Sequence, residues 1–286
     1  MAVIELGYEQ LKQFFNFAKL YEYKSISFIS RMYSKDNFFI PPKKTAKIFC
    51  QTLNSKSSTI KNSVMITSGG IILPLFSEIP PEKFVLIEML KKVLNYNKKI
   101  FCILGVSKDA DLIKNVLNYI SCSSINYTLL ERKLKNAFNI EKNVLTIRNA
   151  KKKDSLLLFP LEEAYLLEEV MVESSSINRQ AALLNLKKTL NTQNVFYAVY
   201  GNEVIAKVNT NAKGLFFNQI GGVYTKPQFR NRGTSTYLMK YLLNNIYSSG
   251  KNAVLYVKKG NIPALTLYKN LGFEIIDNYS AHYFKP

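Results

Sequence analysis

The stretch that decides the fold reads Gly221-Gly222-Val223-Tyr224-Thr225-Lys226-Pro227-Gln228-Phe229-Arg230-Asn231-Arg232-Gly233-Thr234-Ser235. Its start predicts the end of a strand, and the residues after Gly233 predict a helix over 234–247. A short loop thus opens directly into a helix N-terminus, where unpaired backbone N–H groups and the helix dipole favour an anion. Arg230 and Arg232 add full positive charges, and Gly233 lets a ligand approach the backbone without a Cβ in the way. The stretch therefore predicts an anion site suited to a pyrophosphate.

A second segment follows one predicted helix and one predicted strand (253–257) later. It reads Asn261-Ile-Pro-Ala-Leu-Thr-Leu-Tyr268-Lys-Asn-Leu-Gly272-Phe273. Together with Arg230-x-x-Gly233-x-Ser235, it resembles the acyl-CoA loop (Arg/Gln-x-x-Gly-x-Gly/Ala) and the Asn-x-x-Ala-x-x-Leu-Tyr-x-x-x-Gly-Phe segment of the GCN5-related N-acetyltransferases (GNAT). The two motifs occur in the family's order. The resemblance covers about residues 144–286, and the first half matches nothing at motif level.

The resemblance implies a role for each matching position. Backbone groups of Val223 and Thr225, with Tyr224 between them, would pair with the pantetheine arm of acetyl-CoA. Asn261 would contact the pantetheine or adenylate side, and Tyr268 would be the catalytic acid that protonates the departing thiolate. The pyrophosphate would be held by the loop and the first helical turn, namely Arg230, Asn231, Arg232, Gly233, Thr234, Ser235 and Thr236.

Gly221-Gly222 lies where this family bends its fourth strand with a bulge that parts it from the fifth. Two adjacent glycines destabilise an ordinary strand, which agrees with such a bulge. The oxyanion would then be held by a backbone N–H near Val223 or Thr225.

Two positions depart from the family pattern. Ser235 stands where Gly or Ala is usual, and a small hydroxyl fits there. Many members also carry a catalytic glutamate on the fourth strand, whereas residues 216–220 contain no carboxylate. Gln219 could orient a water; other candidate bases are Tyr256 and the helical glutamates Glu162, Glu163, Glu168 and Glu169. A neutral amine would need no strong base.

Plainer interpretations stay open for these residues. Arg230 and Arg232 could be solvated surface arginines, and Tyr268 could be a core tyrosine. The glutamates of residues 162–173 could form a solvated helix face.

The length of 286 residues predicts two domains. In the first half, residues 8–33 read as helical, and strands are expected at 47–53, 63–67 and 70–76. Pro80-Pro81-Glu82 opens a helix whose expected buried stripe is Phe84, Ile87, Leu90, Val93 and Leu94. A strand (99–105), a helix capped by Ser107 (107–120), a strand (124–130) and a linker (136–143) follow.

The second half repeats this order. A strand (144–148) and two helices (156–172 and 178–190) precede strands at 195–200, 203–210 and 216–225. After the helix 234–247 and the strand 253–257 come a helix (262–271) and strands at 273–277 and 280–284. We therefore expect an α/β (α+β) fold of two tandem GNAT-like domains, each a mixed, mostly antiparallel sheet flanked by helices. The first (1–135) is degenerate, since Ser77-Glu78-Ile79 offers no CoA loop, and the second (144–286) is the acetyltransferase domain.

Composition limits the other classes of function. The 39 Lys and Arg against 20 Asp and Glu give a net charge of +19, which leaves nucleic acid open as a partner, but the charges are scattered in short groups. The unpaired cysteines Cys50, Cys102 and Cys122 and the lone His282 argue against a disulfide scaffold, a zinc site and a Ser-His-Asp triad, so no metal is expected. The sequence shows no signal peptide and no membrane-length apolar run, so a cytoplasmic protein is expected. It is expected to be a monomer or homodimer.

The sequence thus favours direct transfer of an acetyl group from acetyl-CoA to an amine, with the first half shaping the acceptor site. The acceptor is a small molecule or a peptide that the sequence does not identify. A non-catalytic acyl-CoA-binding or regulatory protein is the alternative, motivated by the absent glutamate. A third hypothesis is an acetyltransferase whose first half docks an acidic partner such as RNA.

Overall fold

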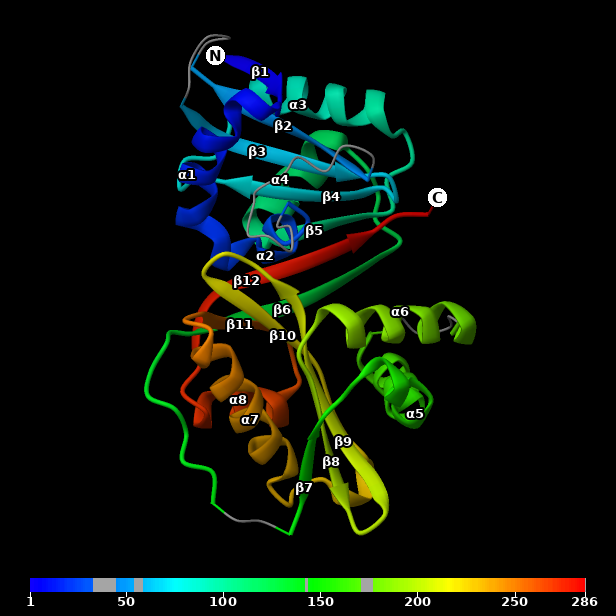
Figure 1. Cartoon of the computed structure of the whole chain (residues 1–286). Helices are drawn as coiled ribbons and strands as arrows, with labels where there is room; N and C mark the ends of the chain where they lie inside the picture. The colour runs from blue at the N-terminus through cyan, green and yellow to red at the C-terminus, as the bar shows by residue number, and fades with distance from the viewer. Residues whose placement is uncertain (33–44, 54–58, 142–143, 171–176, 286) are drawn as a thin grey trace.

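The computed structural model describes residues 1–32, 45–53, 59–141, 144–170 and 177–285. Within them the strands form a twelve-stranded sheet with the order β1-β2-β3-β4-β5-β12-β6-β11-β10-β9-β8-β7 (Figure 1). The first six and last six positions of this order are two half-sheets, which meet at β12 and β6.

The first half contains the strands β1 (Ala2–Glu5), β2 (Ala46–Thr52), β3 (Ile60–Thr67), β4 (Ile71–Phe76), β5 (Cys102–Val106) and β6 (Ser123–Arg132). Its helices are α1 (Leu11–Tyr21), α2 (Ile26–Ile29), α3 (Lys83–Tyr96) and α4 (Ser107–Leu117), with 3-10 turns η1 (Tyr8–Gln10) and η2 (Glu22–Lys24). The second half contains β7 (Thr146–Asn149), β8 (Val195–Tyr200), β9 (Glu203–Lys213), β10 (Phe217–Thr225), β11 (Asn252–Lys258) and β12 (Glu274–Tyr283). Its helices are α5 (Ser155–Tyr165), α6 (Arg179–Thr192), α7 (Thr234–Ser248) and α8 (Ile262–Asn270), with a π-helical turn η4 (Leu166–Val170) and 3-10 turns η3 (Lys152–Asp154) and η5 (Pro227–Phe229).

Both halves have the same order of elements. An edge strand and two helices precede three antiparallel strands, and then come helix, strand, helix and strand. In each half the two strands that flank the middle helix are parallel: β4 with β5, and β10 with β11. The predicted repeat and the mixed, mostly antiparallel sheet are therefore confirmed.

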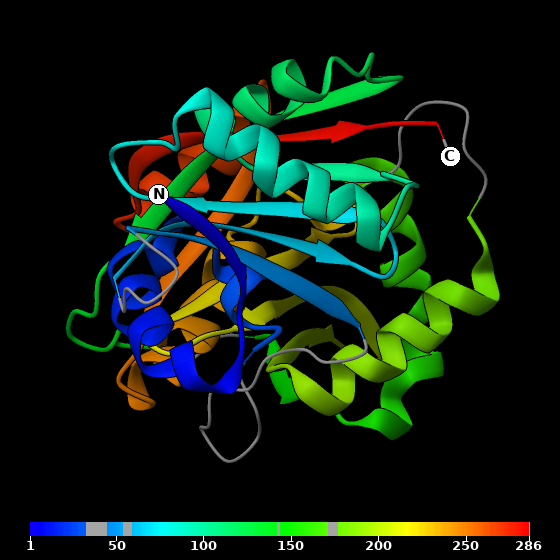
Figure 2. The same cartoon turned by 90° about the horizontal axis from the view of Figure 1, so that it is seen from above.

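Helices cover both faces of the sheet. In the first half, α1 and α2 pack on one face and α3 and α4 on the other (Figure 2). In the second half, α5 and α6 build one apolar core, and α7 and α8 build another. No helix among the described residues is both long and apolar enough to span a membrane.

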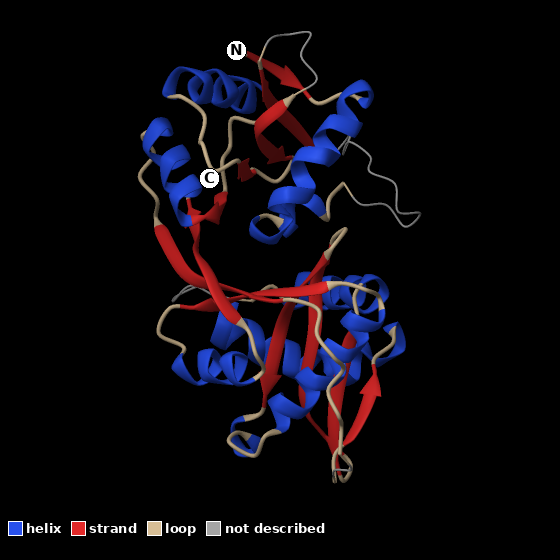
Figure 3. Cartoon of the chain, turned by 90° about the vertical axis from the view of Figure 1, so that its left-hand side faces the viewer, coloured by secondary structure: helices blue, strands red, loops and turns tan. Residues whose placement is uncertain are grey.

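The last strand of each half lies beside the other half's strands. β6 pairs with β11, with Leu130 opposite Leu255, and β12 pairs with β5, with Ala281 opposite Leu104. The two strands also pair with each other along their length and cross between the two lobes (Figure 3). Each half-sheet is thus completed by the other half's last strand. The domain ranges 1–135 and 144–286 stay a prediction, because β6 lies in the first range by sequence and beside the second by pairing.

β12 corrects the prediction of two short strands at 273–277 and 280–284. Asn278 and Tyr279 separate those segments in the sequence, yet they pair with Thr128 and Tyr127 of β6. The register of this pairing shifts between Ile275 and Asp277, which marks a bulge in β12. The backbone partners that make the strand continuous lie far away in the chain, so local sequence does not reveal them. The sequence also missed β1, a four-residue edge strand.

Three helix predictions also change. The segment 8–33 divides into η1, α1, η2 and α2, and residue 33 lies outside the described residues. The predicted helix 156–172 becomes π-helical after Tyr165, and its residues 171 and 172 are likewise not described. Ser107 is the first residue of α4 and does not cap it; its hydroxyl instead bonds with that of Ser280 on β12 at 2.7 Å.

The buried face of α3 differs from the predicted stripe. Phe84 is 58% exposed, whereas Leu90 and Val93 are buried as predicted. The buried face is completed by Val85, Leu86 and Met89. The apolar periodicity fits more than one face of this helix, and contact with the sheet selects one of them.

The segment 133–141 forms neither helix nor strand and contains the described part of the predicted linker. It packs on α7, because the Asn244 side chain accepts from the Phe138 N–H at 2.8 Å and donates to the Phe138 carbonyl at 2.9 Å.

We predict that a fragment of residues 144–286 is unstable. It lacks β6, so the backbone groups of β11 and β12 that pair with β6 would face water, and the apolar faces covered by Leu129 and Leu130 would be exposed. Circular dichroism and urea unfolding of the fragment and the full chain measure this. A cooperative transition at the same urea concentration in both would contradict the prediction.

A second prediction concerns Glu22, a wholly buried residue (0% exposed) of the first half that reaches into the second. Its carboxylate accepts from the backbone N–H groups of Phe216 at 3.1 Å and Phe217 at 3.3 Å. Burial raises the pKa of Glu22 from 4.5 to about 7, although these hydrogen bonds oppose the shift. Between these two pKa values the Glu22 carboxyl is protonated in the folded state and ionised in the unfolded state. The free energy of unfolding therefore falls as pH rises through this window, by up to roughly 1.4 kcal/mol per pH unit.

In Glu22→Gln this contribution is absent, so the variant should gain stability relative to the native chain between pH 5 and pH 7. Urea unfolding of both proteins at the two pH values measures the difference. An identical pH dependence in the two proteins would show that Glu22 does not titrate in this range.

Candidate active site

A cavity of about 690 Å³ opens where β10 and β11 part. The parallel pairs of these strands run from Phe217 opposite Asn252 to Ile220 opposite Leu255. Both strands continue beyond these pairs, to Thr225 and Lys258. The space between their ends is therefore lined by backbone and side chains of both strands.

A bulge at Gly221-Gly222 separates the strands. Gly221 lies opposite Asn209 and Tyr224 opposite Lys207, so Gly222 and Val223 together face one residue of β9. Gly222 has a φ of +57°, and a Cβ on it would lie 1.9 Å from Oδ1 of Asn209. Both the backbone conformation and the space thus require glycine there. The predicted bulge is confirmed.

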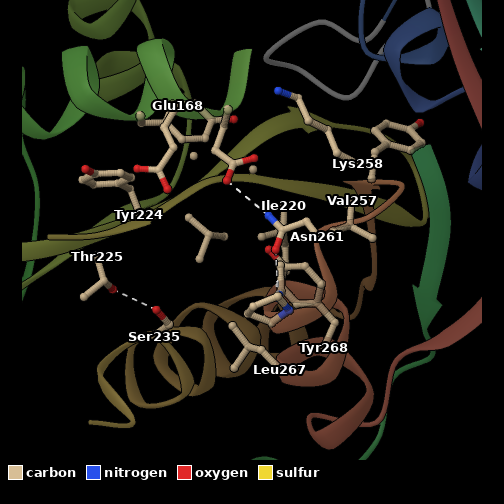
Figure 4. A pocket seen from close by; sticks show the side chains of 18 of the residues that line it. Glu168, Ile220, Tyr224, Thr225, Ser235, Val257, Lys258, Asn261, Leu267 and Tyr268 are labelled. Carbon is tan, nitrogen blue, oxygen red and sulfur yellow. Dashed lines mark hydrogen bonds between the residues drawn. The ribbon is translucent and has the colours of Figure 1, made fainter. Parts of the chain in front are cut away.

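The predicted anion loop borders the same cavity. Gly233, with a φ of +73°, immediately precedes α7, and a Cβ on it would meet no atom within 4 Å. A glycine is therefore needed at this position for the backbone conformation, and the absence of a Cβ leaves open space at the N-terminus of α7. Ser235 Oγ bonds to Thr225 Oγ1 at 2.8 Å, which joins the end of β10 to the first turn of α7 (Figure 4).

Of the predicted site residues, Arg232 alone lies outside the described lining of the cavity; its guanidinium lies 5.6 Å from the Phe229 ring centroid. The structure brings the others together around one space. They are Val223, Tyr224, Thr225, Arg230, Asn231, Gly233, Thr234, Ser235, Thr236, Asn261 and Tyr268.

Two glutamates of η4 contact two of these residues, and the contact made by Asn261 is the dashed line that leaves it toward a carboxylate in Figure 4. Arg230 Nη2 lies 2.7 Å from Glu168 Oε2, and its Nε donates to the Thr225 carbonyl at 3.0 Å. Asn261 caps α8 by accepting from the Ala264 N–H, and its Nδ2 donates to Glu169 Oε1 at 3.2 Å. These carboxylates give Arg230 and Asn261 hydrogen-bond partners within the chain.

Tyr268 lies on α8 and is both a core residue and a lining residue. It is 7% exposed, and its ring packs edge-on against Phe273 at 6.0 Å. Burial raises the pKa of Tyr268 well above its ordinary value, and the nearby Tyr165 and Glu169 raise it further. The phenol therefore keeps its proton near neutral pH and can serve as an acid.

The candidate bases separate into two groups. Glu162 is bound to Lys207 at 2.8 Å and Glu163 to Arg179 at 2.8 Å, and neither lines the cavity. Glu168, Glu169, Gln219 and Tyr256 do line it. Gln219 accepts from the Ser27 hydroxyl at 3.4 Å.

Several lining residues were missed by sequence reasoning, because no motif marks them. Ser27, Leu104 and Tyr127 come from the first half, and Tyr279 comes from β12. The Tyr279 ring stacks on that of Tyr256 at 4.1 Å, and both hydroxyls are buried. Tyr127 and Tyr279 lie on the two exchanged strands, β6 and β12, whereas Ser27 lies on α2 and Leu104 on β5. The described residues contain no cluster of His, Cys, Asp and Glu that could hold a metal ion.

Comparison with known proteins agrees with this geometry. Residues 202–281 match the family model described as "FR47-like protein", which is related to the GNAT family. This segment contains the bulge, the anion loop and Tyr268. A search of curated proteins finds no match.

Solved structures resemble the whole chain at low sequence identity. A Drosophila melanogaster protein solved by X-ray diffraction has a TM-score of 0.72 and 11% identity, over 99% of this chain and 98% of that one. A tandem GNAT protein from the clavulanic acid biosynthesis pathway has a TM-score of 0.60 and 8% identity, over 100% and 99%. A GNAT-family acetyltransferase from Colwellia psychrerythraea has a TM-score of 0.56 and 12% identity, over 100% of both chains. The expected likeness is thus confirmed: residues 202–281 match the GNAT-related FR47-like model, and the chain as a whole has the tandem GNAT fold.

Proposed function

We propose that this chain is an acetyl-CoA-dependent N-acetyltransferase that acts on an amine of a small molecule or peptide. The observation that carries the proposal is one cavity that combines two features. A bulged strand parts from its parallel neighbour, and a helix N-terminus with open space above Gly233 lies at the end of that strand.

The second half offers a fitting place for each part of the donor. The N–H groups of Arg230 to Thr236 and the dipole of α7 would hold the pyrophosphate. Arg230 lies beside this position, where a phosphate would compete with Glu168 for its guanidinium. The edge of β10 at Val223 and Thr225 would bind the pantetheine arm as an added strand would.

Acetyl-CoA supplies the acyl group as a thioester. The Val223 N–H would donate to the thioester oxygen as negative charge develops there. Tyr268, which is protonated at neutral pH as a phenol ordinarily is, would donate its proton to the departing sulfur. Glu168 or Glu169 would take the proton of the amine, directly or through a water held by Gln219, whereas Glu162 and Glu163 are already paired with cations.

The acceptor would enter from the side where the first half lines the cavity. Ser27, Leu104 and Tyr127 lie there, together with Tyr279 of β12. The first half would therefore shape the acceptor site, as the sequence suggests. The expectations about compartment, oligomeric state and nucleic acid stay predictions.

One observation favours a second candidate, a non-catalytic acyl-CoA-binding or regulatory protein. β10 carries no carboxylate, and the two lining glutamates are hydrogen-bonded to Arg230 and Asn261. That candidate requires CoA binding without thiol release for any amine.

Binding of the donor is tested with Gly233→Glu. A glutamate at this position would place bulk and negative charge at the proposed phosphate site. Calorimetry should show acetyl-CoA binding to the native chain and binding weaker by more than about tenfold, or about 1.4 kcal/mol, in the variant. Gly250→Glu is the matched control, because Gly250 has a φ of +70°, open space at its Cβ position and a place at the opposite end of α7. Equal binding by both variants would contradict the site.

The acid is tested with Tyr268→Phe, measured as thiol release over a panel of amines. We expect kcat to fall by about a hundredfold or more while KM for acetyl-CoA is unchanged, because the lost proton is needed only at the departing sulfur. Tyr200→Phe, at an exposed tyrosine outside the described cavity lining, is the control. A native rate in Tyr268→Phe would assign this residue to packing alone.

A further inference from the structure

A buried lysine contacts the bulge from the side of β9. Lys207 is 1% exposed, and its Nζ lies 2.8 Å from the Glu162 carboxylate of α5. It also donates to Asn209 Oδ1 and to the Gly222 carbonyl, each at 3.1 Å. These acceptors use all three N–H groups of an ammonium. A buried ion pair seldom stabilises a fold more than apolar side chains of similar volume would, so its place against the bulge points to another role.

Gly222 is held at its other polar group as well. Burial raises the pKa of the Tyr165 phenol to about 12, and a hydrogen bond from the Gly222 backbone N–H opposes this shift. The Tyr165 ring also lies 4.9 Å from Lys207 Nζ. Lys207, Glu162, Asn209 and Tyr165 together form what we name the bulge clamp, which engages both the N–H and the C=O of Gly222.

Peptide geometry transmits this contact to the cavity. The Gly222 carbonyl and the Val223 N–H belong to one trans peptide unit and point in opposite directions. The carbonyl accepts from Lys207 Nζ, so the Val223 N–H points away from Lys207. Val223 lines the cavity.

The bulge needs such an outside support. Two residues of β10 face one of β9, so the regular ladder of hydrogen bonds is interrupted at this point. Adjacent glycines also have the widest choice of backbone conformations. Without the clamp, the Gly222–Val223 peptide could rotate and turn its N–H away from the cavity.

Resting on the proposed function, we propose that Lys207 is a positioning residue for catalysis. The bulge clamp holds the Val223 N–H toward the thioester oxygen, and the lysine charge polarises the same peptide unit, which makes this N–H a stronger donor.

The test uses the full chain with acetyl-CoA labelled with ¹³C at the carbonyl, because it needs no acceptor. Isotope-edited infrared spectroscopy measures how far binding lowers the carbonyl stretching frequency, which reports the hydrogen bond to the oxygen. Calorimetry with CoA, which has no thioester, measures donor binding separately. The variant is Lys207→Met combined with Glu162→Gln, so that no unpaired charge stays buried. Lys213→Met is the matched control, since Lys213 lies on the same strand and bonds to Asn194.

We expect a lowered frequency in the native chain and in the control, and loss of most of this shift in the double variant with unchanged CoA affinity. With an accepted amine, kcat of the double variant should fall by about a hundredfold at unchanged KM for acetyl-CoA. If the double variant does not fold, as seen by circular dichroism, Tyr165→Phe takes its place and should lose part of the shift.

A full shift in the folded double variant, or in Tyr165→Phe where that variant replaces it, would overturn the role of the clamp. CoA binding without any shift in the native chain would overturn the Val223 donor on which the clamp acts. Absence of CoA binding by the native chain would instead overturn the proposed function, and the inference with it.

Discussion

The antiparallel pairing of β6 with β12 is the interaction on which the rest of the molecule depends. These strands end the two halves, and each is hydrogen-bonded to the other and to a strand of the opposite half. Backbone polar groups in a buried sheet must be paired, so neither half can close its own sheet without the other. An apolar cluster beneath this seam, which includes Leu129, Val254 and Tyr279, reinforces the pairing. Arg132 of β6 strengthens it further by donating to the Leu271 carbonyl and to the Tyr247 hydroxyl.

The exchange also explains why a cavity in the second half contains residues of the first. β6 carries Tyr127 and β12 carries Tyr279 to the floor where β10 and β11 part. The first half has the same topology around its parallel strands β4 and β5, but different side chains follow the end of β4. The end of β4 is followed by Glu78, which binds the buried Lys24 at 3.2 Å, and Lys24 also lies 4.8 Å from the Tyr21 ring.

Much of the candidate site was predictable, because its parts are local. Gly221-Gly222, Gly233 and Asn261 each impose a backbone conformation or a helix start within a few residues, and the structure has the bulge, the loop and the cap there. The partners of the glutamates were not predictable. Glu162 and Glu168 lie six positions apart on one helical segment, yet one binds a buried lysine and the other an arginine at the cavity. Which cation each one meets depends on how α5 and η4 lie against β9 and β10.

The sequence by itself determined most of the order of elements, the anion loop before α7 and the position of the bulge, because short-range patterns govern turns, caps and strand breaks. The tertiary structure decided that 274–283 forms one strand, that Arg232 lies outside the described lining of the cavity, and that first-half side chains enter it. It also placed Lys207 behind Gly222, although no motif contains this residue. The reason is physical: these features arise from hydrogen bonds and ion pairs between segments far apart in the chain. The side chains that form them obey the same burial and charge rules wherever they lie, so only the folded arrangement selects their partners.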